Sequence, residues 1–97
     1  MTQQYIGTGR VLIGLCQDVT IGAASAACTT AFSAQTYKIR VKATSDCRIR
    51  IEKTPVAITT DTYMSAGDVE WFTCNPGEEI ACIQVSSGDT LNISEGD

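Results

Sequence analysis

Histidine is absent from this chain of 97 residues, and positive charge is scarce, with seven Lys and Arg against eleven Asp and Glu. Without histidine the chain lacks the commonest general base and the commonest metal ligand at neutral pH. A Ser–His or Cys–His nucleophilic pair is therefore excluded within one chain, and we expect a protein that is not an enzyme. The net charge of −4 argues against nucleic acid as a partner, because such binding depends mainly on neutralising phosphates.

Long hydrophobic runs are also missing. The apolar stretch near the start, VLIGLC (11–16), is far shorter than the roughly 20 residues that span a bilayer. It is also too short for the hydrophobic region of a secretion signal. We therefore expect no contact with a membrane and no secretion.

The cysteines lack the spacing of a metal site. No two of the five form a CxxC pair, so a zinc site is weakly supported, and their odd number and irregular spacing disfavour a secreted disulfide framework. We expect reduced, buried thiols that act as small hydrophobes, with one or two disulfides as the alternative. The acidic residues after position 60 form no DxDxDG-like calcium loop, and a pair such as Asp68 and Glu70 is explained most simply as solvated. No catalytic residue, metal or cofactor is therefore predicted.

The chain is long enough for one domain with a single thin core, and 43% of its residues are hydrophobic. Residues 20–36 read TIGAASAACTTAFSAQT, a stretch of small side chains with no helical period. We expect residues 1–36 to be an N-terminal segment, partly irregular with one or two short strands, that contacts a partner. Residues 37–97 are then expected to form the β-sandwich core.

Apolar and charged residues alternate from residue 37 to residue 52, which is typical of strands with one buried face. In the first half the positions expected to face the core are Tyr37, Ile39, Val41 and Ala43. After the turn residues 44–46, the corresponding positions are Cys47, Ile49 and Ile51. We predict a β-hairpin with one buried face and one charged face.

Further strands and turns follow to the C-terminus. Asn75-Pro76-Gly77 predicts a tight turn in which the glycine takes a positive φ. The remaining predicted strands lie near residues 56–64, 68–74, 79–85 and 90–94. Turn signals every 8–12 residues, with no helical pattern, indicate an all-β antiparallel sandwich or jelly roll of seven or eight strands.

Charge is segregated along the sequence. Residues 37–53 hold six of the seven basic side chains, whereas residues 54–97 hold eight acidic side chains and no basic one. The basic cluster could be a plain solvated face, or it could dock onto an acidic partner or onto an acidic surface of a second copy. The candidate interface residues are Lys38, Arg40, Lys42, Arg48, Arg50, Glu70 and Trp71.

Trp71 and Phe72 are adjacent, so in a strand their rings point to opposite faces. One ring is therefore expected to lie away from the core. An outward aromatic ring marks a contact surface, or else the N-terminal segment covers it, and the sequence leaves both alternatives open.

A string of short motifs runs over about residues 42–95. The motifs are Ala43-Thr44, Asp46-Cys47, Pro55-Val56-Ala57, Tyr63, Ala66-Gly67, Trp71-Phe72, Pro76-Gly77, Ile83-Gln84 and Gly88 to Ile93. This pattern resembles a group of small tailed-bacteriophage virion proteins. The resemblance departs from the family at Glu70-Trp71-Phe72, where E-Y-F is more usual, and it does not extend to the first 36 residues.

The resemblance implies a β-sandwich structural protein of the virion. The expected role is a capsid decoration (cement) protein, trimeric, that bridges subunits of the major capsid protein on the outer surface of the head after synthesis in the host cytoplasm. One alternative is a tail, neck or fibre-associated virion protein. The other is a carbohydrate- or cell-surface-binding β-sandwich in which Trp71 would stack on a sugar.

Overall fold

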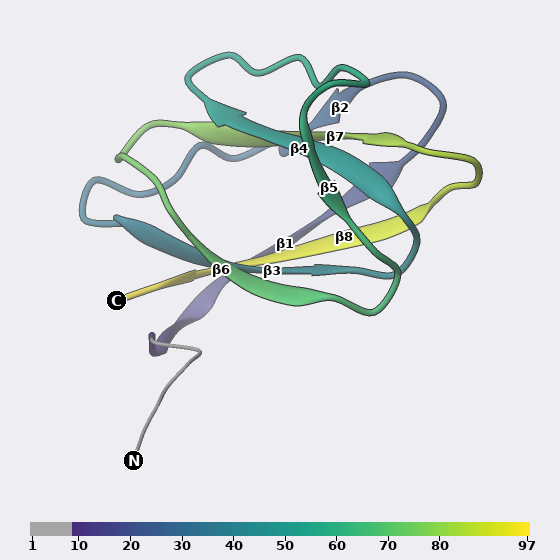
Figure 1. Cartoon of the computed structure of the whole chain (residues 1–97). Helices are drawn as coiled ribbons and strands as arrows, with labels where there is room; N and C mark the ends of the chain where they lie inside the picture. Colours follow the sequence, from purple (N-terminus) through teal and green to yellow (C-terminus); the bar gives the residue numbers. More distant parts are fainter. Residues whose placement is uncertain (1–8) are drawn as a thin grey trace.

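The alternation of apolar and polar residues produces two four-stranded antiparallel sheets that pack face to face in the computed structural model, which describes residues 9–97 (Figure 1). The strands are β1 (Val11–Ile21), β2 (Ala26–Ala27), β3 (Lys38–Ala43), β4 (Cys47–Glu52), β5 (Thr62–Met64), β6 (Val69–Thr73), β7 (Glu79–Gln84) and β8 (Asp89–Gly96). One sheet has the order β1-β8-β3-β6 and the other the order β2-β7-β4-β5. The predicted antiparallel β-sandwich is confirmed, with eight strands in the described part of the chain.

The strand order is that of an antiparallel ribbon wound back on itself. β1 pairs with β8, β2 with β7, β3 with β6 and β4 with β5, and the pairs β3–β8 and β4–β7 complete the two sheets. This is the arrangement of a jelly roll. Most strands that follow one another in the chain therefore lie in opposite sheets.

The predicted hairpin over residues 37–52 is wrong, although both of its strands are present. β3 pairs with β6 and β8, whereas β4 pairs with β5 and β7. Residues 44–46 carry the chain across the sandwich, so that Ile39 and Ile49 are buried from opposite sides of one core. Tyr37 lies before β3 and is exposed rather than buried, because the strand begins at Lys38. Alternation identifies the buried face of a strand, but it does not identify the strand's partner.

The core lies between the inner faces of the two sheets. Its largest fully buried side chains are Ile21, Ile39, Met64, Ile80, Leu91, Ile93 and Val41. Burying an aliphatic side chain of this size stabilises a fold by about 1.5–3 kcal/mol. Both sheets contribute to this list, so neither sheet buries its apolar face without the other.

The N-terminal third of the chain belongs to this core. Val19 and Ile21 of β1 are buried, and so are Cys28 and Phe32 in the segment that follows. The sandwich therefore begins before residue 37, where we expected its core to start. Residues 1–8 of the predicted N-terminal segment lie outside the described residues.

Four of the five cysteines are buried as predicted, and all five are free thiols. Cys16 differs from the prediction because it lies exposed on β1. Burial, together with the nearby charge of Asp46, raises the pKa of Cys47 to about 11. Burial is also the main cause that raises the pKa of Cys82 to about 12. Such thiols remain protonated at neutral pH and act as small apolar core residues.

The predicted turn at residues 75–77 is confirmed. Gly77 has φ of +83°, and the N–H of Glu78 donates to the carbonyl of Asn75 at 3.1 Å. A positive φ strains residues that carry a Cβ, so glycine suits this position.

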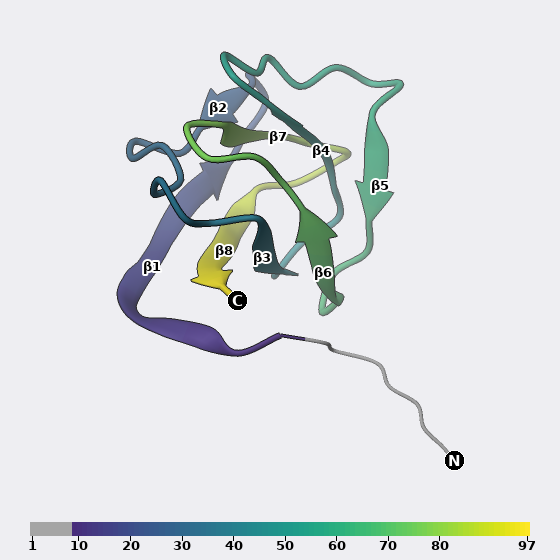
Figure 2. The ribbon, with the colours of Figure 1, turned by 90° about the vertical axis from the view of Figure 1, so that its left-hand side faces the viewer.

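β1 contains a bulge in its first half. Val11 lies opposite Gly96 and Cys16 opposite Ser94, so β1 advances five residues while β8 advances two. Gly14 has φ of +80°, and Ile13 is 100% exposed. Figure 2 shows this part of β1 bending away from the rest of the strand. The bulge therefore carries apolar side chains outward at the open edge of the sheet.

Candidate interaction surface

The candidate surface is the outer face of the sheet β1-β8-β3-β6. Ile39, Val41 and Ala43 point from β3 into the core, so the residues of β3 that alternate with them point outward. These outward residues are Lys38, Arg40 and Lys42. Same-face neighbours on a strand lie about 6.6–6.8 Å apart, so the three basic side chains form a straight row about 13 Å long.

The strands on each side of β3 give this row different borders. Arg40 lies opposite Trp71 on β6 and Ser94 on β8. Lys42 lies opposite Val69 on β6 and Asn92 on β8. The row of basic side chains is therefore flanked by the apolar residues Val69 and Trp71 of β6 on one side. On the other side it is flanked by the small polar residues Asn92 and Ser94 of β8. We call these seven residues, Lys38, Arg40, Lys42, Val69, Trp71, Asn92 and Ser94, the basic face.

Two cations of the basic face have no partner within residues 9–97. Neither Arg40 nor Lys42 makes an ion pair or a side-chain hydrogen bond to any described residue. Asp18 on neighbouring β1 accepts a hydrogen bond of 2.8 Å from the amide of Asn92 instead. Among the described residues, the structure therefore supplies no counter-charge to either cation.

The indole ring of Trp71 packs against backbone at the edge of the basic face. A Cβ built on Gly96 would lie 2.6 Å from the Cζ3 atom of this ring, and one built on Gly9 would lie 2.5 Å from it. Phe72 points the opposite way and packs against the core. The prediction that one ring lies away from the core is confirmed, and the outward ring is half-buried under the segment that precedes β1.

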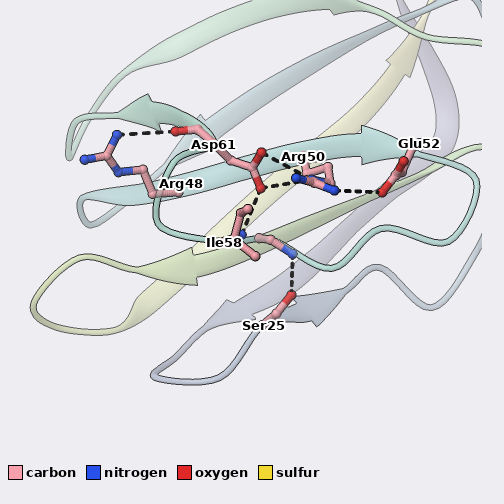
Figure 3. A network of polar contacts seen from close by, with 7 residues as sticks. Ser25, Arg48, Arg50, Glu52, Ile58 and Asp61 are labelled. Carbon is pink, nitrogen blue, oxygen red and sulfur yellow. Dashed lines mark hydrogen bonds and ion pairs between the residues drawn. The ribbon is translucent and has the colours of Figure 1, made fainter.

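Arg48 and Arg50 do not belong to the basic face, because β4 lies in the other sheet. The Nε of Arg50 donates to both carboxylate oxygens of Asp61, at 3.2 and 3.0 Å, and its Nη1 lies 3.3 Å from Glu52 (Figure 3). The guanidinium of Arg48 lies 4.8 Å from the ring centroid of Tyr63, a cation–π contact. Both arginines therefore bind groups of their own chain.

These contacts stabilise the segment between β4 and β5, residues 53–61. Asp61 also accepts the backbone N–H of Ile58 at 2.8 Å, and Arg48 donates to the Asp61 carbonyl at 3.3 Å. The N–H of Ala57 donates to the hydroxyl of Ser25 at 2.8 Å (Figure 3). We therefore assign the two arginines a role in the fold of residues 53–61.

Glu70 is also separate from the basic face. It lies opposite Val41, on the core side of β6, but it is exposed because β6 is at the edge of the sheet. The seven residues predicted as an interface are thus not one surface. The structure brings together Lys38, Arg40, Lys42 and Trp71, and it places the other three elsewhere.

Several acidic side chains after position 60 accept hydrogen bonds at turns. Asp61, Asp68 and Glu78 each accept the backbone N–H of the residue three positions earlier, at 2.7–2.9 Å. The sequence carries this signal as an acidic residue at the end of ITTD, SAGD and NPGE. Acidic residues that close turns contribute less to a docking surface than their number suggests.

Replacing Asp61 with asparagine is expected to lower the melting temperature at pH 7, and this effect should shrink progressively as the pH falls below about 4. The hydrogen bond from Arg50, followed by that from Ile58, lowers the pKa of Asp61. Because the folded-state pKa lies below the unfolded value of about 3.9, the contact stabilises the fold above that pH. The stabilisation is lost as the pH falls through the folded-state value. Thermal unfolding followed by circular dichroism, with Asp89→Asn as an exposed control, measures this, and a difference that does not shrink as the pH is lowered below about 4 would contradict it.

Within residues 9–97 no helix is long and apolar enough to cross a membrane. In the same part of the chain, no three His, Cys, Asp or Glu side chains gather as a metal-binding group. Comparison with known proteins finds no family model, no curated protein and no solved structure that matches this chain.

Proposed function

We propose that this protein is a structural protein of a tailed-bacteriophage virion, a decoration protein that binds the major capsid protein on the outer surface of the head. The observation that carries the proposal is the row of cations on β3, in which Arg40 and Lys42 have no partner among the described residues. The resemblance of about residues 42–95 to small phage virion proteins supports the proposal that the acidic partner belongs to a phage virion.

A sheet face suits this role because its hydrogen-bonded strands present the charges at regular spacing. Opposite charges across an interface orient the partners and accelerate their encounter. Each exposed ion pair contributes only about 0.2–1 kcal/mol. A homotrimer that engages a symmetric shell repeats these weak contacts, and the resulting avidity far exceeds the affinity of one copy.

The bulge of β1 adds exposed apolar side chains to the same sheet, at the edge next to β8. Val11, Ile13 and Leu15 are 49%, 100% and 36% exposed. Clustered exposed apolar side chains often mark a protein–protein contact. The bulge supports our proposal that the N-terminal segment contacts a partner beside the basic face.

The two alternatives are supported unequally. A tail, neck or fibre-associated virion protein could use the same basic face. Carbohydrate binding is less well supported, because one end of the Trp71 ring packs against Gly9 and Gly96 and a sugar needs an open ring face to stack on.

Chemical cross-linking of purified virions, followed by mass spectrometry, tests the proposal. We expect cross-links from Lys42 to the major capsid protein and, after partial disassembly, co-purification with heads rather than tails. Cross-links to tail proteins alone would favour the alternative virion role. Absence of the protein from virions would contradict both.

A further inference from the structure

Glu95 is a buried residue on the inner side of β8, only 3% exposed. The backbone N–H of Ser33 donates to its Oε1 at 3.1 Å, and the hydroxyl of the fully buried Thr36 donates to the same oxygen. The chain therefore holds this side chain in place through one of its two oxygens.

The other oxygen, Oε2, has no donor within the part of the chain that the structure describes. Among residues 9–97, Glu95 also makes no ion pair with Lys or Arg. Burying an unpaired charge is costly, so buried carboxylates are normally paired with a cation or bound to donors through both oxygens. Glu95 therefore has capacity for one positively charged group.

Glu95 also lies at the wall of a pocket of about 100 Å³. It is lined by Glu95 together with Gly14, Leu15, Cys16, Gln17 and Thr30. One wall is fixed, because the amide of Gln17 donates to the Thr30 carbonyl at 2.8 Å and accepts the Thr30 N–H at 3.2 Å. The volume corresponds to about three molecules of liquid water.

The bulge of β1 explains both the space and its chemistry. Residues 12–15 have no register partner on β8, so no regular strand covers the position opposite Glu95. Their carbonyl groups are not used in a β-ladder with β8, and two of these residues, Gly14 and Leu15, line the pocket together with Glu95. Leu15 supplies an apolar wall that is partly open to solvent.

These features select a particular class of ligand. One carboxylate balances one positive charge, whereas calcium takes six to eight oxygen ligands, commonly from several carboxylates. A primary ammonium group carries a single charge, has three N–H donors and no acceptor, and has an alkyl chain that can lie along an apolar wall.

We propose that the pocket between the β1 bulge and Thr30 binds a primary ammonium group, with the Oε2 atom of Glu95 as its counter-charge. The group is either a small free amine or the end of a lysine side chain. This inference does not depend on the proposed role in the virion, because the site is formed within one chain.

Titration of the isotopically labelled full chain with n-butylammonium, followed by backbone amide NMR, tests the proposal. We expect saturable shifts centred on Gly14 to Gln17 and Thr30. Tetramethylammonium has the same charge but no N–H donor, and we expect at least tenfold weaker binding of it. Glu95→Gln should remove the shifts, whereas the matched change of an exposed carboxylate, Glu70→Gln, should leave them intact.

A second titration, with free lysine whose α-amino and α-carboxyl groups are both blocked, identifies the source of the ammonium group. Binding of this compound as well as butylammonium supports a lysine side chain, and binding of butylammonium alone supports a free amine. The absence of saturable shifts in the unmodified protein would overturn the proposal, and so would equal binding of tetramethylammonium, sodium or calcium. Neither result depends on whether the Glu95 variant folds.

Discussion

Virions are expected to lose this protein when Arg40 and Lys42 are both replaced by glutamate, with an apparent affinity for the head at least about 100-fold lower. The two cations lie on one face of β3 and have no partner among residues 9–97. The change removes both attractions and places two like charges against an acidic surface, which costs several kcal/mol at an interface. Binding should also weaken as salt rises, because the Debye length is about 8 Å at physiological ionic strength.

A matched pair of single variants separates this effect from a general change in charge. Lys42→Glu and Lys53→Glu alter the net charge equally, and both side chains are exposed, but only Lys42 lies on the basic face. Sedimentation of each variant with virions from which this protein has been removed measures binding, and circular dichroism checks the fold. Equal binding of both variants would show that the basic face is merely solvated.

Replacing Gly88 with alanine is expected to lower the stability of the fold by about 1–3 kcal/mol or more. A Cβ at this position would lie 2.2 Å from the backbone carbonyl oxygen of Ile21, which has little freedom to move because Ile21 is buried in β1. The turn between β7 and β8 would have to shift away from the end of β1. For a domain of this size, we expect the melting temperature to fall by about 10 °C.

Gly22→Ala is the control for this substitution. No atom lies within 4 Å of a Cβ built on Gly22, and its φ is not positive, so we expect a much smaller change in melting temperature. Differential scanning calorimetry compares the two variants directly. Equal melting temperatures would contradict the close approach of Gly88 to β1.

The sequence predicts strands better than it predicts how they pair. The alternation around Ile39 and Ile49 correctly identifies buried positions, because a strand's side chains point to each face in turn. The same alternation is compatible with a hairpin and with two strands in opposite sheets. Pairing in this sandwich joins distant segments such as β1 and β8, and local sequence does not record such contacts.

The candidate site is predictable in part for a related reason. Outward cations on β3 follow from the alternation, but the contacts of Arg50 with Asp61 depend on the path of residues 53–61. The pocket beside Glu95 depends on the bulge in β1, which the sequence marks only by Gly14. Contacts and pockets formed by segments that are distant in the sequence therefore cannot be predicted from the sequence and become visible only in the structure.

A cryo-electron microscopy map of purified virions, at a resolution that separates side chains, tests the proposed function most directly. We predict density for this β-sandwich on the outer surface of the head, with the sheet β1-β8-β3-β6 facing the shell. Acidic side chains of the major capsid protein should lie within about 4 Å of Arg40 and Lys42. Density for this protein only in the tail, or with the basic face turned to solvent, would contradict the proposal.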